Sequence, residues 1–351
     1  MTQGTQPPKA VIFGLSGLTL TEAEREFFKR ERPAGYILFA RNVETPSQVK
    51  ALVADLRSLD SAHSPVVLID QEGGRVQRLR PPHWRAAPTG LQFGELYQRN
   101  PQSAMEALRL NMALIGKELA DLGIDVDCAP LLDVPVPGAH DVIGDRAYGT
   151  DPAIVSVLAP VCAEGLIDSG VVPVIKHMPG HGRAMSDSHK DLPVVDADLA
   201  TLRATDFKPY AAWAALKPMP FAFAMTAHVI YTAIDAANPA TQSKKVFDEI
   251  IRGELAFDGL IMSDDLSMHA LTGPFEERAA KSLAAGCDVV LHCNGDMAEM
   301  EAVARGTGAV GPRGVRELRA SEAIRLKPRK ALSGVTLAAF ELQVAHRLRH
   351  G

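Results

Sequence analysis

The sequence has few cysteines and no long hydrophobic run. Four cysteines among 351 residues, with no CxxC pair, are too few for a disulfide scaffold and do not suggest a zinc or redox site. No stretch approaches about 18 consecutive apolar residues, which argues against a membrane span. The polar start and the short apolar stretch after it do not form a signal peptide, so we expect a cytoplasmic protein.

The sequence also lacks an overall excess of basic residues. It has 37 Lys and Arg against 42 Asp and Glu, a formal net charge of −5, which argues against a general nucleic-acid binder. Residues 301–351 differ, because they have ten Lys and Arg against four Asp and Glu. Such a tail is able to contact nucleic acid or acidic lipid, but we favour solvated helices at the end of a domain. We expect a monomer that binds neither nucleic acid nor a membrane.

Eight short apolar runs recur along the chain, and each precedes a segment with helical spacing. Short, fully apolar runs are typical of parallel strands covered on both faces. Eight of them alternating with helices predict a (β/α)8 barrel of the TIM type. The alternative is a doubly wound open sheet, but no GxGxxG turn follows the first run. The predicted strands are residues 10–13, 36–39, 66–69, 124–129, 172–175, 221–225, 260–262 and 289–292.

We expect the segments between these apolar runs to be helices, and the end of the chain to be a helical extension of the barrel. No linker, repeat or low-complexity stretch divides the sequence. We therefore expect a catalytic barrel over residues 1–314 and a C-terminal helical extension over 315–351, which is too short to enclose its own core. The predicted helices lie near residues 22–31, 46–59, 103–122, 152–168, 198–216, 244–256 and 275–285.

Chargeable residues follow several of the predicted strands directly. In a barrel of this kind the active site lies at the carboxyl ends of the strands. Any one of these residues alone is equally well explained as a helix cap. Together they favour an active-site rim made of Asp70, Lys176, His177, Thr226, His228, Asp264, Asp265, His292 and Asn294.

The segment 176–195, KHMPGHGRAMSDSHKDLPVV, contains three histidines on what we expect to be a long loop. One interpretation is a metal site with His177, His181, Asp187 and His189 as ligands. The glycines and Pro179 between the first two histidines are incompatible with a helical ligand frame, so we do not favour a metal.

General acid/base chemistry explains the same segment better. Asp187 and His189 are separated by one serine, close enough for the carboxylate to orient the imidazole and raise its basicity. Asp264 follows the seventh predicted strand and supplies a carboxylate nucleophile. A nucleophile with a proton shuttle is the arrangement of retaining glycoside hydrolysis, in which the shuttle is usually a second carboxylic acid.

These motifs resemble those of a known family. KHMPGHGRAMSDSHKDLP resembles the KHFPGHG…DSH…LP signature of bacterial β-N-acetylhexosaminidases in glycoside hydrolase family 3, the single-domain, peptidoglycan-recycling branch. The blocks LIDQEGGRVQRL, IDVDCAPLLDV, VIGDRAYG and FDGLIMSDDLSM resemble that family's blocks in the same order. The resemblance covers about residues 10–295.

The resemblance implies an enzyme that removes terminal N-acetylglucosamine with retention of configuration and without a cofactor or metal. It implies Asp264 as the nucleophile, in preference to Asp265, and His189 held by Asp187 as the acid and base. It also implies that the sugar hydroxyls and the N-acetyl group are held by Asp70, Arg78, Arg146, Lys176 and His177.

Two other functions stay open at this point. A histidine shuttle, being neutral, does not repel an incoming phosphate, so a phosphorylase is an alternative to a hydrolase. A non-catalytic sugar-binding barrel is the other alternative. The expected substrate is a small carbohydrate, an N-acetylglucosaminyl muropeptide.

Overall fold

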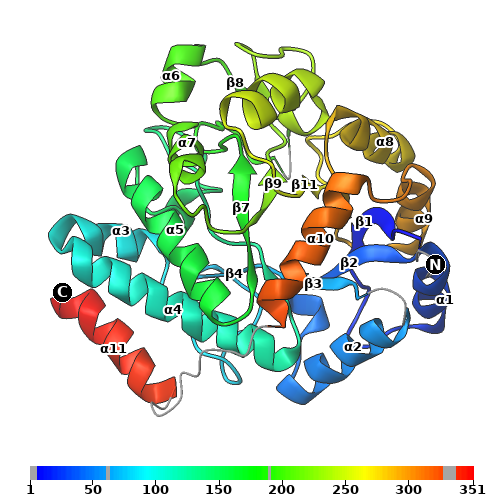
Figure 1. Cartoon of the computed structure of the whole chain (residues 1–351), viewed down its shortest axis with the longest axis horizontal. Helices are drawn as coiled ribbons and strands as arrows, with labels where there is room; N and C mark the ends of the chain where they lie inside the picture. The colour runs from blue at the N-terminus through cyan, green and yellow to red at the C-terminus, as the bar shows by residue number, and fades with distance from the viewer. Residues whose placement is uncertain (1–5, 61–63, 189–190, 327–336) are drawn as a thin grey trace.

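The computed structural model describes residues 6–60, 64–188, 191–326 and 337–351, and it forms a closed parallel barrel surrounded by helices (Figure 1). All eight predicted strands are present, and each one pairs with its neighbours in chain order until the last pairs with the first. The (β/α)8 barrel predicted from the sequence is confirmed. The barrel strands are β1 (Lys9–Phe13), β2 (Pro33–Leu38), β3 (Val66–Ile69), β6 (Val126–Asp127), β7 (Val172–Met178), β9 (Phe223–Thr226), β11 (Ile261–Asp265) and β12 (Val289–His292).

All the helices named in this paragraph except α8 begin after a residue whose side chain caps the helix. Thr21 caps its helix with a capping box, in which its side chain accepts from the N–H of Glu24 and the Glu24 carboxylate accepts in return. Asn100 and Asp151 each cap a helix that begins with a proline, which needs no N–H bond at that position. These helices are α1 (Glu22–Glu31), α2 (Pro46–Ser58), α3 (Gly90–Arg99), α4 (Pro101–Leu122), α5 (Pro152–Asp168), α8 (Phe275–Ala285) and α9 (Met297–Arg305).

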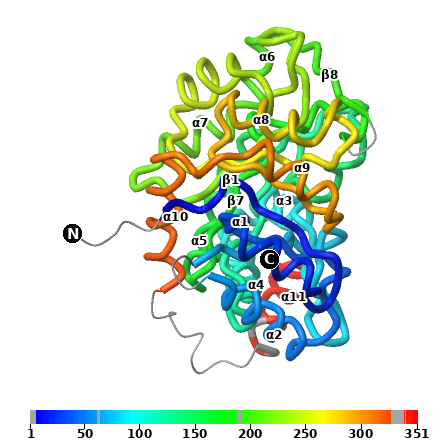
Figure 2. Tube along the Cα trace, turned by 90° about the vertical axis from the view of Figure 1, so that its right-hand side faces the viewer, coloured from blue at the N-terminus to red at the C-terminus, as the bar shows by residue number. Residues whose placement is uncertain are grey.

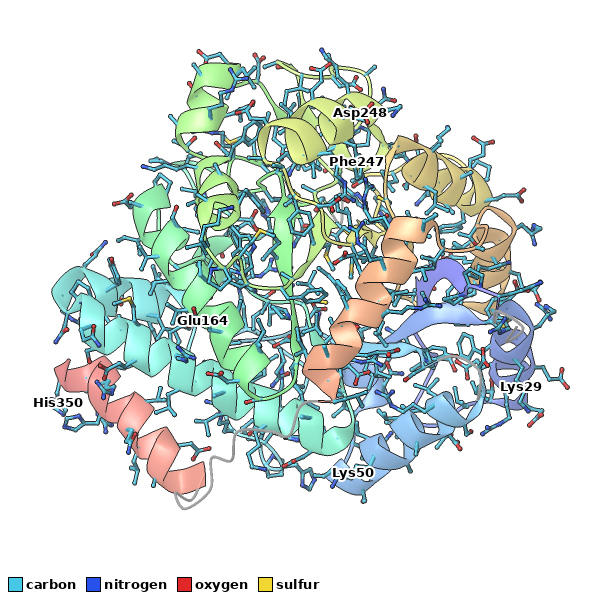
Figure 3. All side chains as sticks on the ribbon, in the orientation of Figure 1. Lys29, Lys50, Glu164, Phe247, Asp248 and His350 are labelled. Carbon is cyan, nitrogen blue, oxygen red and sulfur yellow. The ribbon has the colours of Figure 1, made fainter. Side chains whose placement is uncertain are left out.

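Two predicted helices differ from the structure. The helix expected over 198–216 is two helices, α6 (Leu199–Ala204) and α7 (Lys208–Ala215), because Pro209 lies in the first turn of the second and is tolerated only there. The helix expected over 244–256 is a π-helix, η4 (Val246–Glu254). This helix has one apolar face that is buried and one polar face that is exposed: Phe247 is buried, whereas Asp248 points outward (Figure 3).

The core has two parts. Inside the barrel, alternate strand residues such as Ile12, Val174 and Met262 form one apolar cluster. The other strand residues face outward and pack against the helices, with Phe13, Phe27 and Phe28 in contact at ring separations of 5.3–6.2 Å. All four cysteines are buried and unpaired, as expected. No helix in the described part of the chain is long and apolar enough to span a bilayer.

The chain after the barrel forms α10 (Pro312–Arg325) and α11 (Leu337–His350). α10 lies across the end of the barrel where the strands begin, and Ile324 joins the inner cluster (Figure 1). α11 packs against α4, where Arg347 forms an ion pair of 2.6 Å with Glu106 (Figure 2). Because α10 begins at Pro312, the predicted domain boundary between residues 314 and 315 falls within a helix, and the division stays a prediction.

Candidate active site

A cavity of about 460 Å³ opens at the carboxyl ends of the barrel strands. It lies opposite α10, at the rim where the sequence predicts the chemistry, but four residues of the predicted rim do not line it: Thr226, His228, His292 and Asn294. Seven of the eight predicted site residues line this one cavity, although they come from six different segments of the chain. They are Asp70, Arg78, Arg146, Lys176, His177, Asp187 and Asp264. The eighth, His189, lies outside the described residues.

Lys176 is the centre of the buried charge network in this cavity. It is the fifth residue of β7, only 2% exposed, and its Nζ lies 2.9 Å from Asp70 and 2.7 Å from Glu72. Burial alone lowers the pKa of an amine, but the two carboxylates outweigh it and raise the pKa of Lys176. Lys176 and His177 were expected on a loop, but they belong to the strand, because β7 extends to Met178.

Two arginines complete the network. The guanidinium of Arg78 lies 3.0 Å from Asp70 and stacks on the Phe39 ring at 5.0 Å. Arg146 binds Glu72 through two nitrogens, at 2.8 and 2.9 Å. Burial opposes ionisation of both carboxylates, yet Lys176 with Arg78 lowers the pKa of Asp70, and Arg146 with Lys176 lowers that of Glu72. The floor of the cavity is therefore a set of fixed, fully ionised groups.

Glu72 was not identified from the sequence, although a signal exists for it. Glu72 follows Asp70 by two residues, and in extended chain residues two apart face the same way. It is the middle residue of the first strand of a hairpin that the sequence analysis also missed, formed by β4 (Gln71–Gly73) and β5 (Val76–Gln77). Gly73 and Gly74 have φ of +104° and +56°, which a side chain would disfavour.

Asp133 was also missed, and it supports the histidine segment. It lies in the apolar stretch APLLDVPV, is fully buried, and its Oδ2 lies 2.7 Å from Nδ1 of His177. Its Oδ1 accepts the backbone N–H groups of His177 and His181, at 3.2 and 2.7 Å. Burial opposes ionisation of Asp133, but His177 and then His181 lower its pKa to about 2. A single carboxylate in an otherwise apolar run was the available signal.

His181 and Asp187 lie further along the same segment. His181 is buried, and its Nε2 lies 3.1 Å from Oγ of Ser188. Burial, followed by the charge of His177, lowers the pKa of His181 to about 4. Within the described residues no three His, Cys, Asp or Glu side chains are grouped to hold a metal ion. The four-ligand metal interpretation also involves His189, which lies outside them.

Asp264 and Asp265, at the end of β11, both line the cavity but differ in their hydrogen bonds. Asp264 lines the cavity, and its Oδ1 accepts the N–H of Asp265 at 2.8 Å. The carboxylate of Asp265 accepts the N–H groups of Ser267 and Cys293, both at 3.0 Å, and so joins the loop after β11 to the residue that follows β12. This supports the preference for Asp264 as the reacting group.

Comparison with known proteins identifies the family to which this chain belongs. The Glycosyl hydrolase family 3 N terminal domain matches residues 10–310. The chain belongs to glycoside hydrolase family 3. It is 38% identical to the Beta-hexosaminidase of Bordetella avium over 290 residues, covering 82% of this chain and 81% of that one. It is 37% identical to the Beta-hexosaminidase of Aromatoleum aromaticum over 329 residues, covering 93% and 90%.

Solved family 3 structures agree with this assignment. NagZ from Neisseria gonorrhoeae in complex with N-trifluoroacetyl-D-glucosamine aligns with a TM-score of 0.85 at 30% identity, covering 98% of both chains. A family 3 β-N-acetylglucosaminidase from a Paenibacillus species aligns with a TM-score of 0.82 at 30% identity, covering 96% of this chain and 67% of that one. The resemblance to family 3 hexosaminidases is confirmed, and the chain is a glycoside hydrolase.

Proposed function

We propose that this family 3 hydrolase removes terminal, non-reducing β-linked N-acetylglucosamine with retention of configuration. The observation that carries the proposal is the cavity itself, which combines Asp264 and Asp187 with five polar side chains suited to a sugar. The hexosaminidase relatives and the sugar-bound neighbour support the choice of sugar. A cavity of about 460 Å³ has room for one such ring.

The proposed reaction is a double displacement. Asp264 attacks the anomeric carbon and forms a covalent glycosyl-enzyme, while the leaving oxygen takes a proton from His189. Asp187 holds the imidazole of His189, which then takes a proton from the water that releases the sugar. The N–H of Asp265 stabilises the negative charge of Asp264 before the attack and after the release.

The charge network holds the sugar in this proposal. Asp70, Arg78, Arg146, Lys176 and His177 bind its hydroxyls and its N-acetyl group, since fixed charged groups with several donors or acceptors suit adjacent hydroxyls. Because each of these groups is already held by an ion pair or a hydrogen bond to a neighbouring side chain, they do not reorganise when the sugar enters. We propose a muropeptide fragment with a terminal N-acetylglucosamine as the natural substrate, in cell-wall recycling. A cytoplasmic location and a monomeric state stay predictions.

Product analysis tests the proposal. An aryl β-N-acetylglucosaminide is incubated with the enzyme, with and without phosphate. We expect free N-acetylglucosamine in both cases, and N-acetylglucosamine 1-phosphate as the main product with phosphate would overturn hydrolysis in favour of phosphorolysis. The absence of any turnover would favour a non-catalytic sugar-binding barrel. Rates on an anhydro-muropeptide and on chitobiose then identify the preferred substrate, and a clear preference for chitobiose would overturn the recycling role.

A further inference from the structure

Asp133 and His177 form a buried hydrogen-bonded pair at the edge of the cavity. The carboxylate of Asp133 is 0% exposed and receives three hydrogen bonds, two from backbone N–H groups and one from the imidazole. His177 lines the cavity and is 7% exposed. Since Nδ1 of His177 is bound to Asp133, Nε2 is the ring nitrogen that is left for a ligand.

The carboxylate determines which nitrogen of His177 carries the proton. Burial opposes ionisation of Asp133, but its contacts with His177 lower its pKa to about 2, so it is a carboxylate at neutral pH. A carboxylate only accepts hydrogen bonds, so Nδ1 must be the donor in this pair. A neutral imidazole has a single N–H, and Nε2 is then an acceptor.

The carboxylates of the charge network around Lys176 already receive charged hydrogen bonds. The two carboxylate oxygens of Asp70 accept from Lys176 at 2.9 Å and from Arg78 at 3.0 Å. Both oxygens of Glu72 accept from Arg146. Nε2 of His177 differs from these groups, because His177 lines the cavity and, within the described residues, no cation of the network binds this nitrogen.

We propose that Asp133 is a positioning residue that fixes His177 as a hydrogen-bond acceptor, so that this subsite requires a sugar hydroxyl that donates. The inference rests on the proposed function, because it takes an amino sugar as the occupant. A group that only accepts would place two lone pairs against each other at this position. We expect such a group to weaken binding roughly 10- to 100-fold, as a buried polar group without a partner does.

Inhibition by free sugars tests the acceptor role without involving the reaction. The inhibition constants of N-acetylglucosamine are measured at pH 8, along with those of its 3-, 4- and 6-deoxy and deoxyfluoro derivatives. A fluorine accepts weakly and cannot donate, whereas a deoxy position does neither. At the hydroxyl that His177 binds, the fluoro sugar is expected to bind no better than the deoxy sugar. If fluorine restores binding over the deoxy sugar at every position, no hydroxyl acts as an essential donor and the proposal fails.

The variant Asp133→Asn tests whether the sugar hydroxyl identified in this way donates to His177. The amide oxygen is able to accept the two backbone N–H groups, which turns the NH2 group toward Nδ1 and moves the imidazole proton to Nε2. The fluorine penalty at a position is the ratio of the inhibition constant of the deoxyfluoro sugar to that of N-acetylglucosamine. In Asp133→Asn we expect this ratio to fall at least tenfold at one position and to stay unchanged at the others. Asp127→Asn is the matched control, because Asp127 is equally buried but has no contact with His177, and it should leave the penalty unchanged. An unchanged penalty in Asp133→Asn overturns the proposal.

A measurement on the unaltered enzyme covers the case in which Asp133→Asn does not fold. The 15N chemical shifts of the His177 ring, assigned by their loss in His177→Gln, report which nitrogen carries the proton. At pH 8 we expect the proton on Nδ1 and none on Nε2. A proton on Nε2 overturns the proposal. An enzyme that neither cleaves N-acetylglucosaminides nor binds the sugar would refute the proposed function instead, and the NMR result would still stand for the Asp133–His177 pair.

Discussion

The ammonium group of Lys176 lies 2.9 Å from the carboxylate of Asp70, and both are enclosed at the base of the cavity. Glu72 lies 2.7 Å from the same ammonium group, so one buried cation bridges two carboxylates, each of which also pairs with an arginine. A buried network of ion pairs stabilises the native state only while all of its side chains are present, because removing one leaves an uncompensated buried charge. We therefore expect Asp70 and Lys176, which the proposed function assigns to sugar binding, to contribute to the stability of the native state as well.

Lys176→Met should lower the free energy of unfolding by about 3–5 kcal/mol, as expected when one partner of a buried ion pair is lost. Urea unfolding at pH 7 measures the change. Lys117→Met is the control, because Lys117 pairs with Asp121 at 2.6 Å on the surface, and exposed pairs contribute at most about 1 kcal/mol. Equal stability of the two variants would contradict the assigned role of Lys176.

Asp264→Asn should reduce turnover of an aryl N-acetylglucosaminide by at least about 10³-fold, because the covalent step has no other nucleophile. The amide oxygen is able to keep the hydrogen bond from Asp265, so the thermal unfolding temperature should change little. Asp265→Ala should instead lower the thermal unfolding temperature, because it removes the oxygen that accepts the N–H groups of Ser267, after β11, and Cys293, after β12. Full activity in Asp264→Asn would show that Asp264 is not the nucleophile.

Asp187→Asn and His189→Ala should affect substrates unequally. An activated leaving group such as nitrophenolate needs little protonation, whereas a sugar or alkyl leaving group needs much. We therefore expect a loss of kcat/KM that is at least tenfold greater for an alkyl glycoside than for the nitrophenyl glycoside. Ser186→Ala, in the same segment, should show no such difference. Equal losses on both substrates would argue against the proton shuttle.

His181 should make the protein less stable as the pH falls from about 6.5 to about 4. Its pKa is lowered from 6.5 to about 4, first by burial and then by the charge of His177, so over this range the unfolded chain binds a proton that the native state does not. The expected slope is at most about 1.4 kcal/mol per pH unit. His181→Gln should remove this part of the slope in urea unfolding between pH 8 and 4. The exposed His83→Gln should not, and an unchanged slope in His181→Gln would refute the assignment.

Treatment with EDTA should leave the activity unchanged, because the proposed reaction uses only side chains. The activity is measured after dialysis against the chelator, with a mock-dialysed sample as the control. A solved relative, NagZ from Neisseria gonorrhoeae, was obtained in complex with a zinc ion, which makes zinc the metal to add back. Loss of activity that zinc restores would support the metal interpretation of the histidine segment.

Local sequence features were sufficient to predict most of the fold. The apolar run at 66–69 and the capped helix at 152–168 were predicted at their observed bounds, because strand burial and helix capping depend on neighbouring residues. The helix at 198–216 was predicted wrongly in its extent, although Pro209 within it was a visible reason to divide it. The hairpin that contains Glu72 has strands of three and two residues, too short to show a period.

The sequence by itself determined the barrel, the rim on which polar residues gather, and the family, because each of these is written in local runs and motifs. Only the tertiary structure decided the partners at the cavity: that Lys176 joins Asp70 to Glu72, that Arg146 pairs with Glu72, and that Asp133 binds His177. These pairs join segments 44 to 106 residues apart. Closing the barrel brings them together, and the low exposure of the closed site makes their charges interact strongly.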